Sequence, residues 1–445
     1  MIIHNLKELN KKIRYHNQID FKNFKKNKDT KIEHSQRLKF FSKHNFEYPS
    51  EDFTEEKGIV ICAGGLVYIP GAIILIKILK KLNCSLPIEV WYLDDSEMDD
   101  YLVSVITDLG AKCVNASLVR KKYPVRHMGG WEIKCYSVIH SNFRQVLFID
   151  ADNIPTRNPT FLFDDKEYIK NGMIYWSDRE FFDVDAEIFK ICDIILHRKI
   201  RKMESGQMVI NKEECWEALQ VTMHLNEYSD FYYKYVWGDK DTFQIGCMIK
   251  KKNVNIINIT PKEMQYNKYT VGWKLGMMQP FHDGTVLFQH RGFDKFSLFK
   301  KPKKIYNFLY EKECIEILNT IKEDFSKGRK EIYWTEPSTE LEKKTTQEII
   351  EQKYFLYKKA DTDSREIEFL EDYSVDKNRD IYEEISKDTV KDSWTVKEIN
   401  GELSLLVFGK DSLFLVMKLK NNIWEGTLVK ERILTKLCPI KKDIY

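Results

Sequence analysis

The chain lacks any long apolar run. None of its 445 residues belongs to a continuous apolar stretch of the roughly 18 residues that a membrane-spanning helix needs. The first 29 residues, beginning MIIHNLKELN, also lack the apolar segment of a signal peptide. We therefore expect a cytoplasmic protein with no transmembrane segment. Its basic residues 7–43 suit a solvated helix better than peripheral contact with an anionic membrane surface.

A strong net charge and a regular cysteine pattern are absent too. The 71 Lys and Arg residues nearly balance the 68 Asp and Glu residues, giving a net charge of +3, which excludes nucleic-acid binding driven by bulk charge. Nine cysteines are scattered without a CxxC pair, so we expect reduced thiols rather than a disulfide framework or a zinc site. The absence of GxGxxG argues against a dinucleotide cofactor.

Apolar strands and helices alternate in the first third of the chain. The predicted strands are GIVICAGG (58–65), PIEVWYLDD (87–95), AKCVNA (111–116) and QVLFID (145–150), and helical segments near 70–82, 98–109 and 130–143 separate them. This order predicts a doubly wound, mostly parallel α/β sheet, which binds ligands at the carboxyl ends of its strands. Gly64-Gly65, Asp94-Asp95 and the segment 150–152 should then share one edge.

Two aspartates follow the fourth strand in VLFIDADNIPTRNP. Asp150 and Asp152 are two residues apart on an extended chain, so they project to the same side. Carboxylates arranged in this way bind Mg²⁺ or Mn²⁺, and such a cation neutralises a leaving diphosphate. One alternative is an ordinary strand-end turn. Another is a haloacid-dehalogenase-like phosphatase with Asp150 as nucleophile, although there the strand usually opens the domain and Thr or Val, not Asn153, follows the second aspartate.

Further motifs follow in a fixed order: ESGQMVINK (204–212), WGDKDTFQIG (237–246) and FQHRGF (288–293). With GIVICAGG, LPIEVWYLDD, GWEIKCYSVIHSNF and FRQVLFIDADNIPTRNPTFLFD, they make residues 57–295 similar to the fungal-type α-mannosyltransferases of glycosyltransferase family 71, relatives of enzymes that add mannose branches in the Golgi. The resemblance implies a GT-A-like fold, a nucleotide-sugar donor, a divalent metal and an α-linked product with retained configuration. The sequence shows no family-type membrane anchor and adds a C-terminal β module, so its donor and acceptor need not be the fungal ones.

The resemblance also implies donor-binding roles, each beside a structural alternative. Ala63, Gly64 and Gly65 would flank the nucleotide, or would only form a tight turn. Asp94 would accept a ribose or base hydrogen bond, a role open to Asp95, or would be a solvated strand end. Lys134 would lie near the donor phosphate, or would be an exposed helical lysine.

Catalytic and metal-binding roles come from the later motifs. Gln207 would lie near the anomeric carbon, and Glu204 would hydrogen-bond donor or acceptor. Asp239 and Asp241 would contact sugar hydroxyls, with Asp241 the more base-like, or they would cap a helix. His290 would complete the metal site with Asp150 and Asp152, or would be structural.

These features predict four segments: a charged helical extension (1–55), a GT-A-like domain (56–335), a charged helix and linker (336–392) and a small antiparallel β module (393–445) that binds glycan or a partner, or forms an oligomer. The predicted activity is metal-dependent transfer of a hexose, mannose from GDP-mannose above all, to a glycan hydroxyl. A transferase that uses a UDP-sugar to move glucose, galactose or N-acetylglucosamine remains open, as do a glycan-binding pseudoenzyme and the phosphatase.

Overall fold

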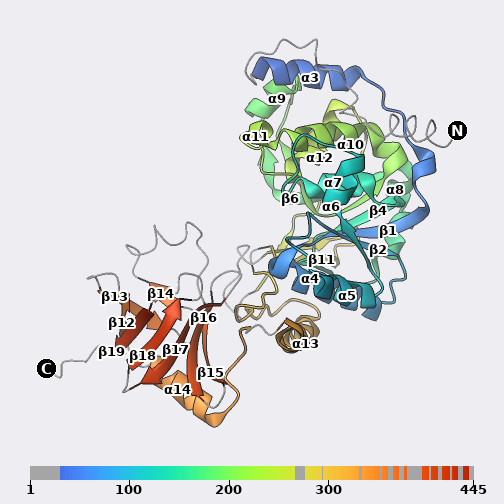
Figure 1. The fold of residues 1–445 in the computed structure, drawn as a ribbon. Coiled ribbons are helices and arrows are strands. Elements are labelled where there is room, and N and C mark those ends of the chain that lie inside the picture. Colours follow the sequence, from blue (N-terminus) through green and yellow to red (C-terminus); the bar gives the residue numbers. More distant parts are fainter. Residues whose placement is uncertain are drawn as a thin grey trace. The chain divides into compact units, whose positions relative to one another are not determined.

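The structure is a computed structural model. It describes residues 31–265, 276–292, 294–329 and 333–350, and the strands 353–358, 364–369, 375–377, 393–399, 402–408, 413–420, 423–428 and 434–439 (Figure 1). Most of the predicted N-terminal extension, residues 1–30, lies outside the described residues. The chain divides into two compact units, one containing the described residues up to Lys295 together with Lys304–Glu311, and the other containing Phe296–Lys303 and the chain from Lys312 onward.

A seven-stranded sheet forms the centre of the first unit, in the order β3-β2-β1-β4-β7-β6-β8. β1 is parallel to β2 and β4, β2 is parallel to β3, and β6 is parallel to β8, whereas β7 runs antiparallel to β4 and β6. The predicted mostly parallel α/β sheet is therefore confirmed. The bounds are β1 Glu55–Cys62, β2 Ile88–Tyr92, β3 Lys112–Asn115, β4 Phe143–Ile149, β6 Met173–Phe182, β7 Ile200–Asn211 and β8 Asn255–Ile257.

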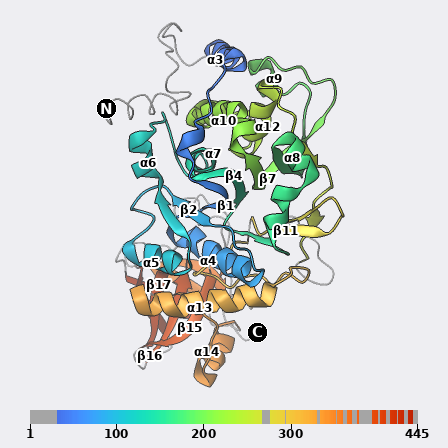
Figure 2. The same cartoon turned by 90° about the vertical axis from the view of Figure 1, so that its right-hand side faces the viewer.

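Helices cover both faces of this sheet (Figures 1 and 2). α4 (Gly65–Lys81) and α5 (Asp100–Asp108) lie on one face, and α7 (Ile133–His140), α10 (Lys212–Glu227) and α12 (Lys240–Ile249) lie on the other. The other helices are α3 (Lys31–Lys43), α6 (Ala116–Lys122), α8 (Lys166–Asn171), α9 (Glu187–Ile191), α11 (Ser229–Tyr232) and the 3₁₀ turns Ser50–Asp52 and Pro159–Asp164.

Local sequence explains where these helices begin. The Asp99 carboxylate accepts a hydrogen bond from the Leu102 N–H at 2.9 Å and so caps α5. α4 starts at Gly65, earlier than the Pro70 suggested by the sequence, and keeps Pro70 inside the helix. α3 is not purely peripheral, because it buries Leu38 and Phe41 in the core of this unit.

A small four-stranded sheet, ordered β5-β11-β10-β9, lies beside the end of β4. Its strands are β5 Asn153–Pro155, β9 Lys262–Glu263, β10 Met277–Pro280 and β11 Val286–His290. β5 and β11 are antiparallel, and His290 stands opposite Asn153 in their register. This pairing carries His290 to the segment that follows β4.

The second unit contains α13 (Glu311–Arg329) from Lys312 onward, α14 (Glu340–Ile350) and an eight-stranded sheet in the order β14-β13-β12-β19-β18-β17-β16-β15. Its strand pairs are antiparallel, as predicted for the C-terminal module. Trp394 and Trp424 are buried in its core. The strands are β12 Lys353–Lys358, β13 Ser364–Phe369, β14 Val375–Lys377, β15 Ser393–Ile399, β16 Glu402–Phe408, β17 Leu413–Lys420, β18 Ile423–Leu428 and β19 Leu434–Pro439.

The structure adds strands that the sequence did not suggest. β12, β13 and β14 fall in the segment expected to be helix and linker, where α14 alone matches the expected helix. The second half of β13, EIEF in SREIEF, alternates glutamate with apolar residues, a pattern suited to a strand with one face in solvent. The sheet therefore extends beyond the predicted module.

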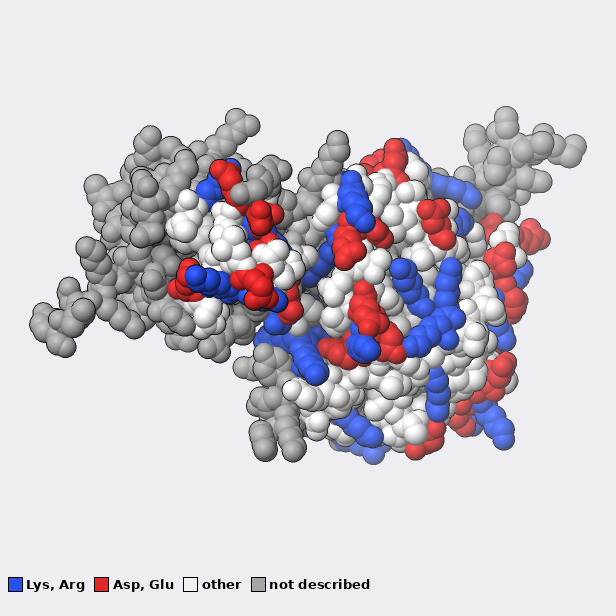
Figure 3. Space-filling model, turned by 90° about the horizontal axis from the view of Figure 1, so that it is seen from below, with Lys and Arg blue, Asp and Glu red and all other residues white. Residues whose placement is uncertain are grey.

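The described residues agree with two features of the composition. Basic and acidic side chains are interspersed on the face drawn in Figure 3, as a near-balanced charge leads one to expect. The eight cysteines whose side chains are described are all free. In the described part of the chain, no helix combines the length and apolarity required to cross a bilayer.

Candidate metal and donor site

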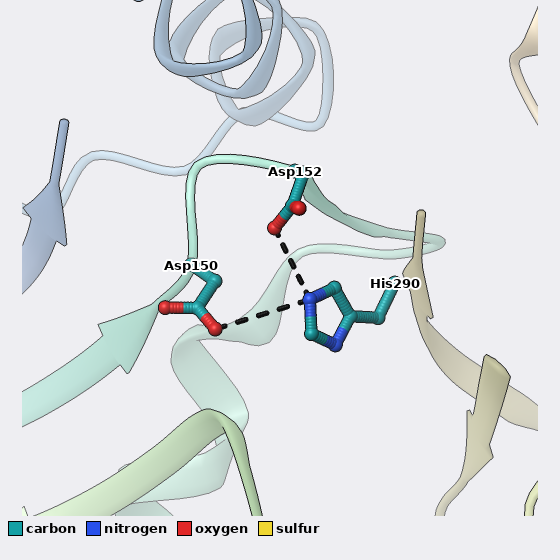
Figure 4. A group of neighbouring side chains, drawn as sticks. All are labelled: Asp150, Asp152 and His290. Carbon is teal, nitrogen blue, oxygen red and sulfur yellow. Dashed lines mark ion pairs between the residues drawn. The ribbon is translucent and has the colours of Figure 1, made fainter. Parts of the chain in front are cut away.

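Asp150, Asp152 and His290 meet at the carboxyl end of β4 (Figure 4). The chain turns directly after β4, where the Asp150 N–H donates to the Gly206 carbonyl at 2.9 Å and the Asn153 N–H donates to the Asp150 carbonyl at 3.0 Å. The Arg291 N–H donates to the Asp152 carbonyl at 2.9 Å. Backbone hydrogen bonds therefore hold both aspartates and the end of β11 in one place.

The geometry of these three side chains fits a divalent cation. His290 Nε2 lies 3.1 Å from Asp152 Oδ1 and 3.9 Å from Asp150 Oδ2. One ligand atom from each residue lies within 4.8 Å of those of the other two. Two carboxylates and an imidazole form a donor set suited to Mn²⁺ and acceptable to Mg²⁺. The structure thus brings together the three predicted metal ligands, while their role in binding metal stays a prediction.

Two lysines neutralise the aspartates. Lys134 Nζ lies 3.2 Å from Asp150 Oδ1 and 3.1 Å from Asp239 Oδ2, and it donates to the Ser205 carbonyl at 3.2 Å. Lys295 forms an ion pair with Asp152 Oδ2. Lys134 is buried, so the alternative of an exposed helical lysine is wrong.

Mutual contacts shift the pKa values of the cluster. Burial lowers the pKa of His290, but Asp152 and Glu204 outweigh it and raise this pKa to about 10. Burial also opposes the charged form of Glu204, yet the hydrogen bond and charge of His290 lower the pKa of Glu204 to about 2. Burial raises the pKa of Asp150 despite the nearby Lys134. The site therefore holds positively and negatively charged side chains close together.

The two candidate residues on β7 lie beneath this cluster. Glu204 Oε1 lies 3.6 Å from His290 Nδ1 and accepts the Gly206 N–H at 3.1 Å. Gln207 is fully buried, and its Oε1 accepts a hydrogen bond from Asn153 Nδ2 at 2.6 Å. Gly206 needs to be glycine, because an added Cβ would lie 2.6 Å from His290 Nδ1. The predicted contacts of Glu204 and Gln207 with the sugars stay predictions.

Asp239 and Asp241 do not share one side, unlike Asp150 and Asp152. Asp239 faces Lys134 and makes no side-chain cap to α12. Asp241 is fully buried, accepts the Trp237 N–H at 3.0 Å and lies 3.7 Å from Lys202 Nζ. Helical residues two apart point in directions that differ by roughly 200°, so only Asp239 joins the cluster.

The remaining predicted donor residues lie at the ends of β1 and β2. Ala63 is buried, and its N–H donates to the Trp91 carbonyl at 2.8 Å. An added Cβ on Gly64 would lie 2.1 Å from Glu97 Oε2, whereas Gly65 has φ +65° and open space around its Cβ position. Asp94 is exposed and accepts the Ser96 hydroxyl at 2.6 Å and the Ser96 N–H at 2.9 Å, and these two hydrogen bonds lower its pKa. Their nucleotide contacts stay predictions.

Sequence reasoning missed two residues at this site. Lys295 comes from a loop after β11, where no periodicity fixes its direction, so only proximity to His290 could have suggested it. Gly71 lies inside α4, and an added Cβ would lie 2.6 Å from the Ala151 carbonyl oxygen. A glycine inside an apolar helix signals close backbone approach, and this signal was available in the sequence.

Comparisons with known proteins place this geometry in context. The chain is 26% identical to the α-1,2-mannosyltransferase MNN24 of Candida albicans over 233 residues, covering 43% of this chain and 33% of the relative. It is also 26% identical to the α-1,2-mannosyltransferase MNN5 of Saccharomyces cerevisiae over 262 residues, covering 45% of this chain and 44% of the relative. The chain thus spans only a third to under a half of the length of these relatives.

Solved structures resemble the chain weakly. A galactosyltransferase in complex with donor and acceptor sugar analogues aligns with 59% of this chain and 95% of its own, with 14% identity and a TM-score of 0.38. A family model described as "Mannosyltransferase putative" matches residues 56–202 and 193–282, about half of the chain. The chain therefore belongs to this mannosyltransferase family.

Proposed function

We propose that the chain is a metal-dependent mannosyltransferase that moves mannose from GDP-mannose to a glycan hydroxyl with an α linkage and retained configuration. The observation that carries this proposal is the meeting of Asp150, Asp152 and His290 at the sheet edge, flanked by Lys134 and Lys295. The names of the fungal relatives support mannose as the sugar.

Asp150, Asp152 and His290 would hold Mn²⁺ or Mg²⁺. The bound cation would offset the charge that develops on the leaving diphosphate. Lys134 is fixed between Asp150 and Asp239 and would present its ammonium to a phosphate oxygen. Lys295 contacts Asp152 from another part of the chain and would bind the diphosphate in the same way.

Retention of configuration would follow from front-face attack. The candidate acids already have partners: Glu204 accepts the Gly206 N–H, Asp239 pairs with Lys134, and Asp241 is fully buried. None of these three is a free nucleophile beside the metal-ligand cluster. The acceptor oxygen would bond to the anomeric carbon as the bond to the diphosphate breaks, and its proton would pass to the departing phosphate oxygen.

The test measures turnover of GDP-mannose, UDP-glucose, UDP-galactose and UDP-N-acetylglucosamine with Mn²⁺, with Mg²⁺ and with EDTA. We expect GDP-mannose to be hydrolysed slowly alone and transferred to methyl α-mannoside, in both cases only with metal. Asp152→Asn should reduce turnover about a hundredfold or more, because it removes one of two charged ligands. Asp164→Asn is the matched control, since the Asp164 side chain is 76% exposed.

Each of the other outcomes would indicate a different function for the chain. Full activity of Asp152→Asn would end the metal assignment, and preference for a UDP-sugar would replace the donor. Cleavage of simple phosphomonoesters instead would indicate the phosphatase. Binding of nucleotide or glycan without turnover would indicate a pseudoenzyme.

A further inference from the structure

Two tryptophans break the pattern of tryptophan burial in this chain. Trp131 is 59% exposed and Trp237 is 73% exposed. The other tryptophans whose side chains are described are at most 3% exposed: Trp91, Trp176, Trp216, Trp334, Trp394 and Trp424. Exposed indole rings lose the free energy of apolar burial, so a pair of them beside a polar site points to a ligand.

Both exposed tryptophans are close in the chain to charged residues of the candidate site, Lys134 and Asp239. Trp131 lies two residues before α7, and its carbonyl accepts the N–H of Lys134, the lysine between Asp150 and Asp239. Trp237 is two residues before Asp239. The two tryptophans therefore come from separate segments whose neighbouring residues, Lys134 and Asp239, form an ion pair.

A glycine joins the two indole-bearing segments. Gly238 has φ +63°, and an added Cβ would lie 2.9 Å from Trp131 Cε3, so the Trp131 ring packs on the backbone next to Trp237. The Trp131 ring also lies near Tyr233, with ring centroids 6.3 Å apart. The Trp237 N–H donates to Asp241 at 3.0 Å, which fixes the backbone that carries the second indole. The Trp131 ring is thus held by its packing on Gly238, and the backbone that carries Trp237 is held by Asp241.

We propose that Trp131 and Trp237 form the acceptor subsite, where a mannopyranoside ring stacks on indole. This inference rests on the proposed function and adds the chemical class of the acceptor. A pyranose ring presents C–H groups on one face, which pack on the face of an aromatic ring, while its hydroxyls stay available to polar neighbours. Asp239 lies beside Trp237 and offers a carboxylate for such a hydroxyl.

The experiment uses the full chain with GDP-mannose, Mn²⁺ and, as acceptors, methyl α-mannoside and a panel of mannobiosides. Trp131→Ala and Trp237→Ala should each raise the acceptor KM on the order of tenfold, the loss that corresponds to one aromatic stacking contact. The same variants should change the rate of acceptor-independent GDP-mannose hydrolysis about tenfold less than they change the acceptor KM. Trp131→Phe and Trp237→Phe keep an aromatic face and should restore most of the affinity.

Tyr306→Ala is the matched control, because Tyr306 is another exposed aromatic residue, 58% exposed, and should leave the acceptor KM unchanged. An unchanged acceptor KM in both alanine variants would overturn the subsite while the proposed function stands. Hydrolysis by the wild-type chain without transfer to any mannoside would overturn the ligand class. Absence of both hydrolysis and transfer would defeat the proposed function itself.

Discussion

Replacing Lys322 by methionine should raise the free energy of unfolding of the second unit, and this increase should become smaller as the pH rises. Lys322 lies in α13 and is 1% exposed. Its Nζ has no hydrogen-bond partner among the described residues and lies 4.8 Å from the centroid of the Trp334 ring. Burial lowers the pKa of Lys322 from 10.5 to about 7, and the charge of Glu336 opposes this shift only weakly.

The sign of the pH dependence follows from proton binding. Between pH 7 and pH 10.5 the folded chain leaves Lys322 mostly neutral while the unfolded chain keeps it protonated. The unfolded state then binds more protons, so stability rises with pH in this window. At about 1.4 kcal/mol per pKa unit, the buried lysine lowers the free energy of unfolding by about 4 kcal/mol at pH 7 and by about 1 kcal/mol at pH 10.

Hydrogen exchange of peptides from α13, followed by mass spectrometry, measures the effect locally. A local measurement is needed because two compact units need not unfold together. The free energy of opening of α13 should be about 4 kcal/mol higher in the variant than in the wild type at pH 7, and most of this difference should vanish by pH 10. Lys327→Met, at an exposed position of the same helix, is the control and should show no such trend. An equal difference at both pH values would refute the assignment of a neutral buried lysine.

The remaining predictions concern the metal and donor site. Gly71→Ala should weaken Mn²⁺ binding on the order of tenfold, because the added Cβ would lie 2.6 Å from the Ala151 carbonyl oxygen. Gly130→Ala is the control and should bind Mn²⁺ normally, since an added Cβ there has nothing within 4 Å. Equal Mn²⁺ affinities of the two variants in calorimetry would contradict this prediction. Lys295→Met should tighten Mn²⁺ binding without nucleotide, since Asp152 loses its ion pair, and should raise the KM for GDP-mannose on the order of tenfold. Weaker Mn²⁺ binding in that variant would remove Lys295 from the site.

The parallel half of the central sheet could be predicted because its strands are short apolar runs that end in glycine or acid. β1, β2 and β4 are buried in this way and align in parallel as expected. The antiparallel insertion of β7 between β4 and β6 could not be predicted. Alternation along a strand shows which side chains share a face, but it does not show the direction of the neighbouring strand.

In the candidate site, too, some positions could be predicted from the sequence and others could not. Asp150 and Asp152 were predicted as a pair from their spacing on an extended chain. In the structure they lie in the turn that follows β4, where the hydrogen bond from the Asn153 N–H to the Asp150 carbonyl helps to position them, rather than strand alternation. His290 was predictable because it ends a strand, and the β5–β11 register then delivers it to Asp152. Asp239 and Asp241 have the same spacing, but helical geometry separates their directions. Their predicted contacts with sugar hydroxyls stay predictions.

The charges of the site explain why Lys295 matters although no pattern in the sequence marks it. Asp150, Asp152, Glu204 and Asp239 face Lys134, Lys295 and His290 within one cluster. A divalent cation alone would have to compete with these bases for the aspartates, and a diphosphate alone would meet the acids. Together a divalent cation and a doubly charged diphosphate add no net charge, so the lysines can turn from the aspartates to the phosphates at little electrostatic cost. Lys295 contacts Asp152 and comes from a loop rather than a helix, so its removal should affect metal and nucleotide in opposite directions.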